Sequence, residues 1–352
     1  MVDFTLTDEQ QALREMAHDF AENEIRPVAW EYDKDGTWPA DVFKKAHDVG
    51  LMNTHIPEAY GGPGLSYLDG CLIEEETSWG CSGIATSLGA NGLASAPVIL
   101  AGSDVAGMRT TAKKVGDKYV INGSKCFITN GEYADWYTVY AKTDPEAGHR
   151  GISAFVVPRD ETIVIDKKED KMGQRASNTA TVTFNDTEVP AENILGEENG
   201  GFKVAMMTLD RTRPGVAAMA TGISQAAFDL AKQYSIERQQ FGVPIAMHQA
   251  IQFMIADMAT KVHLSRIATW NSAVLLDQGK RNTLESSHAK RFAADSCMEI
   301  TTDAVQVHGG YGFIKEYKVE KFMRDAKIMQ LYEGTSQIQR LVIARETLMP
   351  RP

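Results

Sequence analysis

The sequence predicts a multi-domain α+β protein in which an N-terminal helical domain, a small middle β domain and a C-terminal four-helix bundle follow one another. Three observations predict this order. Apolar residues recur at helical spacing in the first third, β-branched and aromatic runs fill the middle, and long amphipathic patterns fill the rest. The 352 residues, 43% of them hydrophobic, suffice for two or three domains. We expect these domains at 1–103, 104–195 and 196–352.

The N-terminal region is predicted to be helical from its first residues. Thr7 and Gln10 have the spacing of a capping box, a hydroxyl followed three residues later by a carboxamide. A second apolar stripe runs over 42–49, and a third helix is expected around 68–76. The run 81–96 that follows is rich in Gly, Ala and Ser, and such small side chains let a helix or a ligand approach closely.

The middle region changes to strand periodicity. Three β-branched or aromatic runs, at 137–141, 152–157 and 181–184, are bounded by turn residues and predict strands. The dipeptide Asn122-Gly123 follows the strand-like residues 118–121 and predicts a hairpin turn, because it tolerates the positive φ angles of a two-residue loop.

The C-terminal region carries four amphipathic patterns whose lengths suit a four-helix bundle. They cover roughly 201–235, 244–278, 283–307 and 316–348. Within the last one, Gly334 is expected to break a helix, and Ser336 with Gln339 to cap the next.

Glu333 stands at this predicted break between helices, where a side chain can point into a cavity. A carboxylate in an apolar pocket has a raised pKa, which suits a general base. The alternative from the junction alone is an ordinary solvated glutamate.

Composition excludes several classes of function. The net charge of −11 argues against nucleic acid and against anionic membranes, since both require clustered Lys and Arg. The four cysteines form no C-x-x-C pair, and the glycine-rich, nucleophile-elbow and zinc motifs of other enzyme classes are missing, so no metal site is predicted. No apolar run is long enough for a bilayer, and the first residues resemble neither a signal nor a transit peptide. We expect a cytoplasmic protein, or a mitochondrial matrix protein in a eukaryote.

Five motifs, in order along the chain, resemble those of the acyl-CoA dehydrogenase family. The most specific is the run Tyr-Glu-Gly-Thr-Ser-Gln-Ile-Gln-Arg, which is similar to the sequence around the family's catalytic glutamate. The five motifs lie at 126–131, 210–214, 237–242, 306–313 and 332–340. Because they span nearly the whole chain, the family's fold and its FAD-dependent desaturation of acyl-CoA thioesters are what the resemblance implies.

The resemblance assigns roles to particular residues. Glu333 matches the base that removes the α-proton while a hydride leaves the β-carbon for the flavin, and its backbone N–H would polarise the thioester carbonyl. Some relatives place the base near Arg211-Thr212, where this chain has no acid. The FAD-binding positions would be Phe127, Thr129, Arg238, Phe241, Gln306, Gly310, Thr335 and Gln337. Arg238, Phe241, Gln306 and Gly310 would reach the FAD of a neighbouring subunit in a homotetramer.

Further positions match the family's acyl-CoA site, namely Ser103, Asp210, Arg213, Tyr332 and Gly334. For Arg213, a structural ion pair with Asp210 is an equally good reading. Ala85 and Gly89 would leave depth at the end of the pocket, so a short- to medium-chain acyl group is expected, with electrons passing to an electron-transfer flavoprotein.

One segment of the family pattern is missing. Here Val98-Ile99-Leu100 runs directly into Ala101-Gly102-Ser103-Asp104, where relatives carry about thirty more residues that include the first strand of the β domain. Three readings follow. The chain is a working acyl-CoA dehydrogenase, a catalytically impaired or inactive deletion form or paralogue that acts only as an assembly partner, or an acyl-CoA oxidase that reoxidises rapidly in air.

Overall fold

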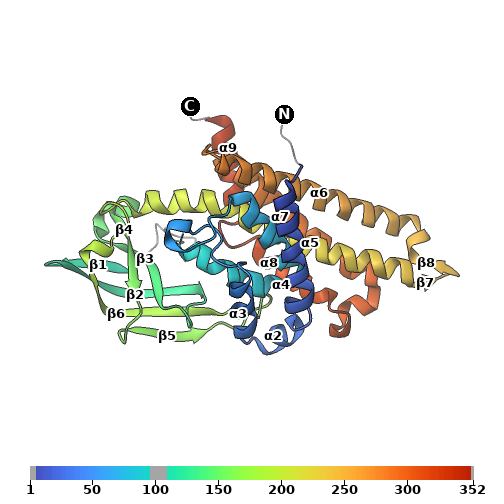
Figure 1. Ribbon diagram of the computed structural model, residues 1–352, viewed down its shortest axis with the longest axis horizontal. Helices are drawn as coiled ribbons and strands as arrows, with labels where there is room; N and C mark the ends of the chain where they lie inside the picture. The colour runs from blue at the N-terminus through green and yellow to red at the C-terminus, as the bar shows by residue number, and fades with distance from the viewer. Residues whose placement is uncertain (1–4, 96–108, 350–352) are drawn as a thin grey trace. The chain divides into compact units, whose positions relative to one another are not determined.

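The computed structural model describes residues 5–95 and 109–349 (Figure 1). Their contacts divide the chain into two compact units. The first comprises Met1–Leu88, Lys171–Ala176 and Thr212–Pro352, and the second comprises Gly89–Asp170 and Ser177–Arg211. The chain passes between the units inside two long helices, at 88–89 and 211–212. This division does not test the three predicted domain boundaries, which stay a prediction. The predicted α+β class, with strands between two helical regions of sequence, is confirmed.

The helices of the first unit come from both ends of the chain. The N-terminal ones are α1 (Asp8–Phe20), α2 (Ala29–Asp35), α3 (Ala40–Asp48) and α4 (Tyr67–Ser95). The C-terminal ones are α5 (Gly201–Glu237), α6 (Gln249–Asp277), α7 (Thr283–His308), α8 (Val319–Met329) and α9 (Ser336–Leu348). The last residues of α4 and the first of α5 belong to the second unit.

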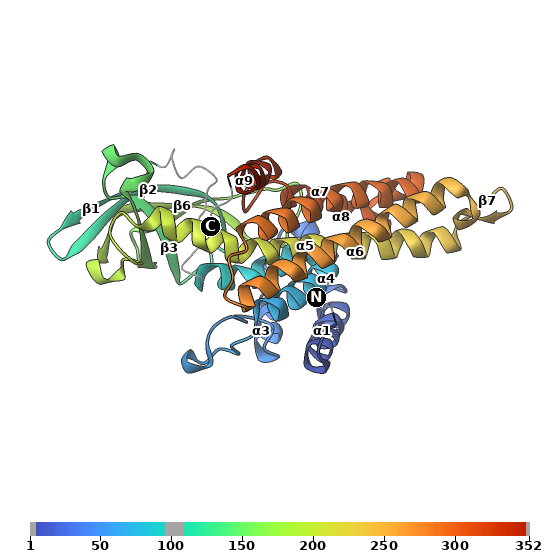
Figure 2. The same cartoon turned by 90° about the horizontal axis from the view of Figure 1, so that it is seen from above.

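The core of the first unit is built where α4, α5, α6, α7 and α8 bury their apolar faces together. Both views show α5 and α6 running side by side toward the short hairpin of β7 (Gln239–Gln240) and β8 (Val243–Pro244) (Figures 1 and 2). A Cβ at Gly222 of α5 would lie 2.0 Å from the carbonyl oxygen of Glu75, so this glycine lets the α5 and α4 backbones touch. Among the helices in the described ranges, none has the length and apolar character that a bilayer span requires.

The second unit is organised around a six-stranded sheet of order β4-β3-β1-β2-β6-β5. The strands are β1 (Thr111–Val115), β2 (Lys118–Thr129), β3 (Trp136–Lys142), β4 (Ile152–Pro158), β5 (Ile163–Lys168) and β6 (Thr179–Pro190). Neighbouring strands pair antiparallel except β1 and β3, which share a single parallel register pair, Thr111 with Lys142. The predicted strands at 137–141, 152–157 and 181–184 are confirmed.

The predicted hairpin at Asn122-Gly123 is wrong. β2 continues through both residues and turns back on β1 earlier, at Gly116-Asp117. The register of β2 against β6 shifts between Ile121 and Gly123, and Gly123 has a φ of +132°. The dipeptide therefore forms an irregularity inside a long strand, which uses the same glycine freedom as a turn.

The terminal regions follow the sequence patterns with one difference. The capping box of α1 is present, since the Thr7 hydroxyl accepts from Gln10 N and the Gln10 side chain from Thr7 N. The fourth amphipathic pattern, at 316–348, is two helices, α8 and α9, separated at 330–335. The predicted break at Gly334 lies in this interval.

Candidate active site

The turn between α8 and α9 presents Glu333 on a left-handed backbone. The φ angle is +55° at Glu333 and +89° at Gly334, a region that glycine adopts freely and glutamate seldom. The carbonyl oxygens of both residues accept hydrogen bonds from Gln339 Nε2, at 3.2 and 3.1 Å. Lys290 Nζ on α7 donates a further bond, 2.8 Å long, to the Gly334 carbonyl. Two side chains, from α9 and α7, therefore hold the turn in place.

The prediction that Ser336 and Gln339 cap α9 is wrong. Thr335 is the N-cap, and its hydroxyl accepts from Ile338 N at 3.2 Å. Ser336 donates its hydroxyl to Asp295 Oδ1 at 2.8 Å, while Gln339 is used by the turn. Because α9 begins one residue earlier than the prediction assumed, the capping hydroxyl is that of Thr335.

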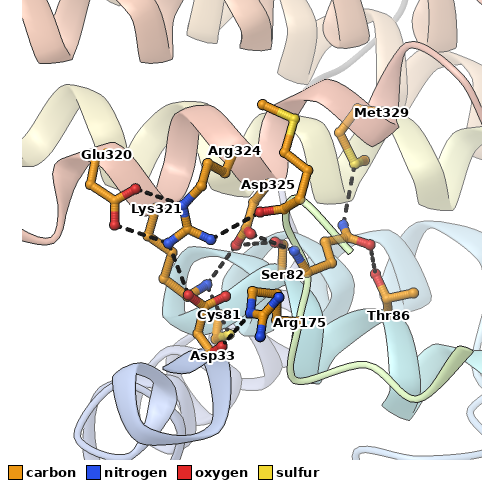
Figure 3. Close-up of polar contacts among 12 residues, drawn as sticks. Asp33, Cys81, Ser82, Thr86, Arg175, Glu320, Lys321, Arg324, Asp325 and Met329 are labelled. Carbon is orange, nitrogen blue, oxygen red and sulfur yellow. Dashed lines mark hydrogen bonds and ion pairs between the residues drawn. The ribbon is translucent and has the colours of Figure 1, made fainter. Parts of the chain in front are cut away.

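A buried polar cluster fixes α8, the helix that leads into the Glu333 turn (Figure 3). Lys321 Nζ lies 2.5 Å from Asp325 Oδ2, and Ser82 of α4 donates its hydroxyl to the same oxygen at 2.9 Å. Lys321 also donates to Cys81 Sγ at 3.3 Å. Cys81 interrupts α4 with φ −163° and ψ 115°.

Electrostatics explains why this cluster stays charged. Burial alone would lower the pKa of Lys321, but Asp325, together with Cys81 and Asp33, more than offsets this effect, so that the pKa lies above its ordinary value. Asp325 Oδ1 accepts in addition from Gln174 N at 2.5 Å. Beside this pair, Arg324 joins Glu320 and, at 2.9 Å, Asp33 of α2 (Figure 3). The start of the Glu333 turn is thus tied to α4, to α2 and to the segment 171–176.

The carboxylate of Glu333 lies in an environment that shifts its titration. Burial raises the pKa of Glu333 above its ordinary value of 4.5. Thr212 Oγ1 on α5 donates to Glu333 Oε2 at 2.8 Å, and the positive charges of Arg213 and Lys290 also favour the ionised form. Burial lowers the pKa of Lys290 from 10.5 to about 8, although the Glu333 charge opposes this. The result is a desolvated carboxylate with one oxygen held by a hydroxyl and cations close by.

A second acid stands beside Glu333, and sequence reasoning missed it. Glu74 on α4 has its pKa raised from 4.5 to about 8 by burial and by the charge of Glu333. One signal in the sequence was available. Glu74, Glu75 and Glu76 are consecutive, and three successive helical positions point in such different directions that they cannot all face solvent on a packed helix. Sequence reasoning also missed the hydroxyl of Thr212, which lies in the 210–214 motif but was given no role, and the buried Lys290, which lies in none of the five motifs.

The predicted residues for the neighbouring subunit's FAD lie at the end of the first unit where β7 and β8 meet. Phe241 occupies this turn with a positive φ and is 93% exposed. The Arg238 guanidinium lies over the Tyr311 ring, 5.4 Å from its centre. A Cβ added at Gly310 would meet no atom within 4 Å, so its backbone is open to close approach. Gln306 lies in the last turn of α7, just before this segment.

The other predicted cofactor residues are divided between the units. Phe127 and Thr129 end strand β2 of the second unit, and Phe127 is 69% exposed on a left-handed backbone, with φ +60°. Thr335 and Gln337 lie at the start of α9 in the first unit, near Glu333 in sequence and in space. A half-buried guanidinium, exposed aromatic rings and open glycine backbone are groups that suit a dinucleotide such as FAD, so the residues present fit it.

The predicted acyl-CoA residues are brought together only in part. Tyr332 and Gly334 flank Glu333, and Arg213 is buried on α5 beside the carboxylate that it helps to keep ionised. Asp210 belongs to the second unit, and the choice between an ion pair and substrate binding for Arg213 stays open. Ser103 and the joint at 98–104 lie outside the described residues.

Three family models match consecutive parts of the chain. They are the N-terminal domain of acyl-CoA dehydrogenase at residues 7–109, its middle domain at 99–187 and its C-terminal domain at 199–348. Together they cover nearly the whole length in the family's own order.

Individual relatives agree over nearly their full lengths. Cyclohex-1-ene-1-carbonyl-CoA dehydrogenase of Geobacter metallireducens is 44% identical, with 98% of this chain and 99% of the relative covered. A probable mitochondrial medium-chain specific acyl-CoA dehydrogenase of Caenorhabditis briggsae is 42% identical over 379 residues, covering 98% and 92%. The structure of butyryl-CoA dehydrogenase from Megasphaera elsdenii superposes with a TM-score of 0.95 at 40% identity, covering 99% of this chain and all of that one.

Proposed function

The chain belongs to the acyl-CoA dehydrogenase family of FAD-dependent oxidoreductases, and from this premise we propose that it oxidises a short- to medium-chain acyl-CoA to the trans-2-enoyl-CoA. The observation that carries the proposal is the carboxylate of Glu333, which is desolvated, backed by Thr212 and fixed on a held turn. Such a group has the basicity and the position that α-proton abstraction needs.

Glu333 acts as the base in its ionised form. The Thr212 hydroxyl occupies Oε2 at 2.8 Å, which leaves Oε1 to accept the α-proton. Because burial raises the pKa of the carboxyl, it binds that proton more firmly than a solvated glutamate would. FAD, when bound, accepts the hydride that leaves the β-carbon.

The backbone of the same turn supplies the group that polarises the substrate. Within the described residues, the N–H of Glu333 donates to no acceptor, because the left-handed turn takes it out of both helices. A free N–H beside the base suits the thioester carbonyl oxygen, which gains negative charge as the α-proton leaves. Base and oxyanion donor therefore come from one residue.

FAD would be gripped by residues from more than one copy of the chain. Phe241, Gln306 and Gly310 are exposed at the end of the first unit and Arg238 is half-buried beside them, which supports the proposal that they reach the cofactor of a neighbour. Phe127, Thr129, Thr335 and Gln337 would hold FAD from the chain's own side. We expect a homotetramer, which light scattering of the purified protein would test.

The relatives also support a proposal for the acyl group and the electron acceptor. Relatives named for butyryl-CoA and for medium-chain substrates support a short- to medium-chain acyl group, and the small side chain of Ala85 on α4 agrees with the depth expected at the end of the pocket. An electron-transfer flavoprotein is the proposed acceptor. An oxidase would be reoxidised by air alone.

One observation favours a second reading, in which the chain is a shortened form that assembles but does not turn over. The alignment with the worm relative extends over 379 residues, more than the 352 of this chain, which supports a missing internal segment. The proposed joint lies in a part of the chain outside the described residues.

Turnover assays separate these readings. The purified protein would be given butyryl-, hexanoyl-, octanoyl- and palmitoyl-CoA with an artificial electron acceptor, with and without added FAD. If the shorter substrates are oxidised only when the artificial electron acceptor is present, the result supports the dehydrogenase reading. Oxidation by air alone indicates an oxidase, and a protein that binds no FAD indicates the inactive shortened form.

A further inference from the structure

Glu74 differs from the two glutamates that follow it. Glu75 is paired with Arg266 at 2.7 Å, and Glu76 with Arg14 at 2.6 Å and His18 at 2.8 Å. These pairs give Glu75 and Glu76 a structural role between α4, α6 and α1. For the carboxyl of Glu74, the described part of the chain provides no hydrogen-bond or ion-pair partner.

The Glu74 carboxyl lies against the same turn of α5 that supports the base. A Cβ at Gly215 would stand 2.2 Å from Glu74 Oε2 and 3.1 Å from Oε1, so only glycine leaves room for this carboxyl. Thr212, which donates to Glu333, is three residues earlier and therefore on the same face of α5. The two carboxyls thus share one helical turn as their support.

The two acids differ in what favours their ionised forms. Burial raises the pKa of both. The Thr212 hydroxyl and the charges of Arg213 and Lys290 favour the ionised form of Glu333, whereas the charge of Glu333 disfavours the ionised form of Glu74. The other titratable groups that face Glu74 are Cys71, one turn earlier on α4, and Tyr332, and burial raises the pKa of both. The pKa of about 8 favours the protonated form of Glu74 at neutral pH, and a protonated carboxyl beside the proposed base is a hydrogen-bond donor.

The donor is accessible. Glu74, Thr212, Gly215 and Glu333 all keep accessible surface, while the residues next to them in sequence, Ile73, Glu75, Arg213 and Pro214, are buried. A buried or half-buried polar group without a partner costs roughly 1–3 kcal/mol, so an acceptor brought by a ligand would recover that cost.

We propose that Glu74 is a specificity-determining residue of the acyl site, whose carboxylic acid donates a hydrogen bond to an oxygen atom on the acyl chain. The site then prefers acyl groups that carry a hydrogen-bond acceptor near the reacting carbons over wholly hydrocarbon chains of the same length. This inference rests on the proposed function, since Glu333 locates the α-carbon. The substrate class is that of oxygen-bearing acyl-CoA thioesters.

Ether analogues test the donor directly, because an ether oxygen accepts a hydrogen bond and cannot donate one. The values of kcat/KM for 4-oxahexanoyl-CoA and 5-oxahexanoyl-CoA would be divided by that for hexanoyl-CoA. These ratios would be compared among the wild type, Glu74→Leu, Glu74→Gln and the control Glu76→Gln. Effects intrinsic to the ether substrates are common to all four proteins and cancel in the comparison.

We expect the larger of the two ratios to fall about three- to tenfold in Glu74→Leu, which is the loss of one hydrogen bond. Glu74→Gln keeps the ratio because its amide still donates, and Glu76→Gln keeps it because that side chain pairs with α1 and not with Glu333. Equal ratios in the wild type and Glu74→Leu, with hexanoyl-CoA still oxidised, would overturn the role of Glu74 alone. A wild type that oxidises none of the three substrates would overturn the proposed function, and this inference with it.

Discussion

At the position of the proposed base, burial and a hydroxyl act in opposite directions on the ionisation of the carboxylate. Burial pushes the pKa of Glu333 up, and the Thr212 bond of 2.8 Å pulls it down. A base must be ionised before it removes a proton, so activity falls as the pH drops through this pKa.

Removing the hydroxyl should therefore move the acid limb of the pH profile. Thr212→Val keeps the shape of the side chain but loses the donor, so the pKa of Glu333 rises and the limb of kcat/KM shifts to higher pH. Above that limb the variant should approach wild-type activity. The check is a pH profile with hexanoyl-CoA, and a limb that stays in place or moves to lower pH would contradict the assignment.

Lys290 acts on the base through the backbone of the turn. Its ammonium is fully buried, donates to the Gly334 carbonyl at 2.8 Å and contributes charge that favours the ionised Glu333. We regard it as a positioning residue, since it touches the turn and not the reacting atoms.

Lys290→Met should lower kcat about tenfold while leaving KM little changed, because the apolar stem is kept and only the hold on the turn is lost. The acid limb should also move to higher pH. Steady-state kinetics against hexanoyl-CoA, with circular dichroism to confirm the fold, would check this. A rise in KM at constant kcat would indicate a substrate-binding role instead.

At the scale of elements, α8 depends on its buried ion pair. Lys321 Nζ lies 2.5 Å from Asp325 Oδ2, and the Asp325 carboxylate also accepts hydrogen bonds from the Ser82 hydroxyl and the backbone N–H of Gln174. Breaking one side leaves a buried charge without its partner, which is costlier than the pair itself is worth.

A double-mutant cycle should show this. Lys321→Met and Asp325→Asn should each lower the free energy of unfolding by roughly 3–5 kcal/mol, and the double variant by clearly less than their sum. Urea unfolding curves give the three values. Strictly additive losses would mean that the two side chains do not interact in the folded protein.

The contact between α4 and α5 depends on glycine. A Cβ at Gly222 would lie 2.0 Å from the Glu75 carbonyl, whereas a Cβ at Gly92, also helical, would meet nothing within 4 Å. Gly222→Ala should therefore destabilise the fold by roughly 1–3 kcal/mol. Gly92→Ala should be neutral or slightly stabilising, since alanine favours a helix. The thermal unfolding midpoints of the two variants test this difference. Equal changes in midpoint would contradict the close approach of the α4 and α5 backbones.

Some elements could be predicted because their signal is local. The capping box at Thr7 and the strands around Tyr137, Ile152 and Thr181 depend on residues close in sequence. The hairpin at Asn122-Gly123 failed because the local preference for positive φ is met equally well by a bulge, and pairing with β6 decides between the two. The predicted N-cap of α9 was wrong by one position for a similar reason, since the hydroxyls of Thr335 and Ser336 are neighbours and either could cap the helix.

At the scale of the whole molecule, the proposed base could be located from its motif, whereas its partners could not. Glu333 lies in a distinctive run, but Lys290 and Glu74 lie in none of the five motifs, and the 210–214 motif does not show that Thr212 contacts Glu333. Their roles arise only when α4, α5 and α7 bring them to one turn. The two-unit division likewise follows from contacts that link distant parts of the chain.

The central claim is that this chain uses Glu333 to desaturate an acyl-CoA with bound FAD. The most direct test is the visible flavin spectrum of the purified wild type and of Glu333→Gln, recorded before and after anaerobic addition of hexanoyl-CoA. We predict that the wild-type flavin band bleaches and that the variant, loaded with the same amount of FAD, keeps its band while still binding the substrate. A wild type that holds FAD but does not bleach, or a variant that bleaches at the wild-type rate, would contradict the account.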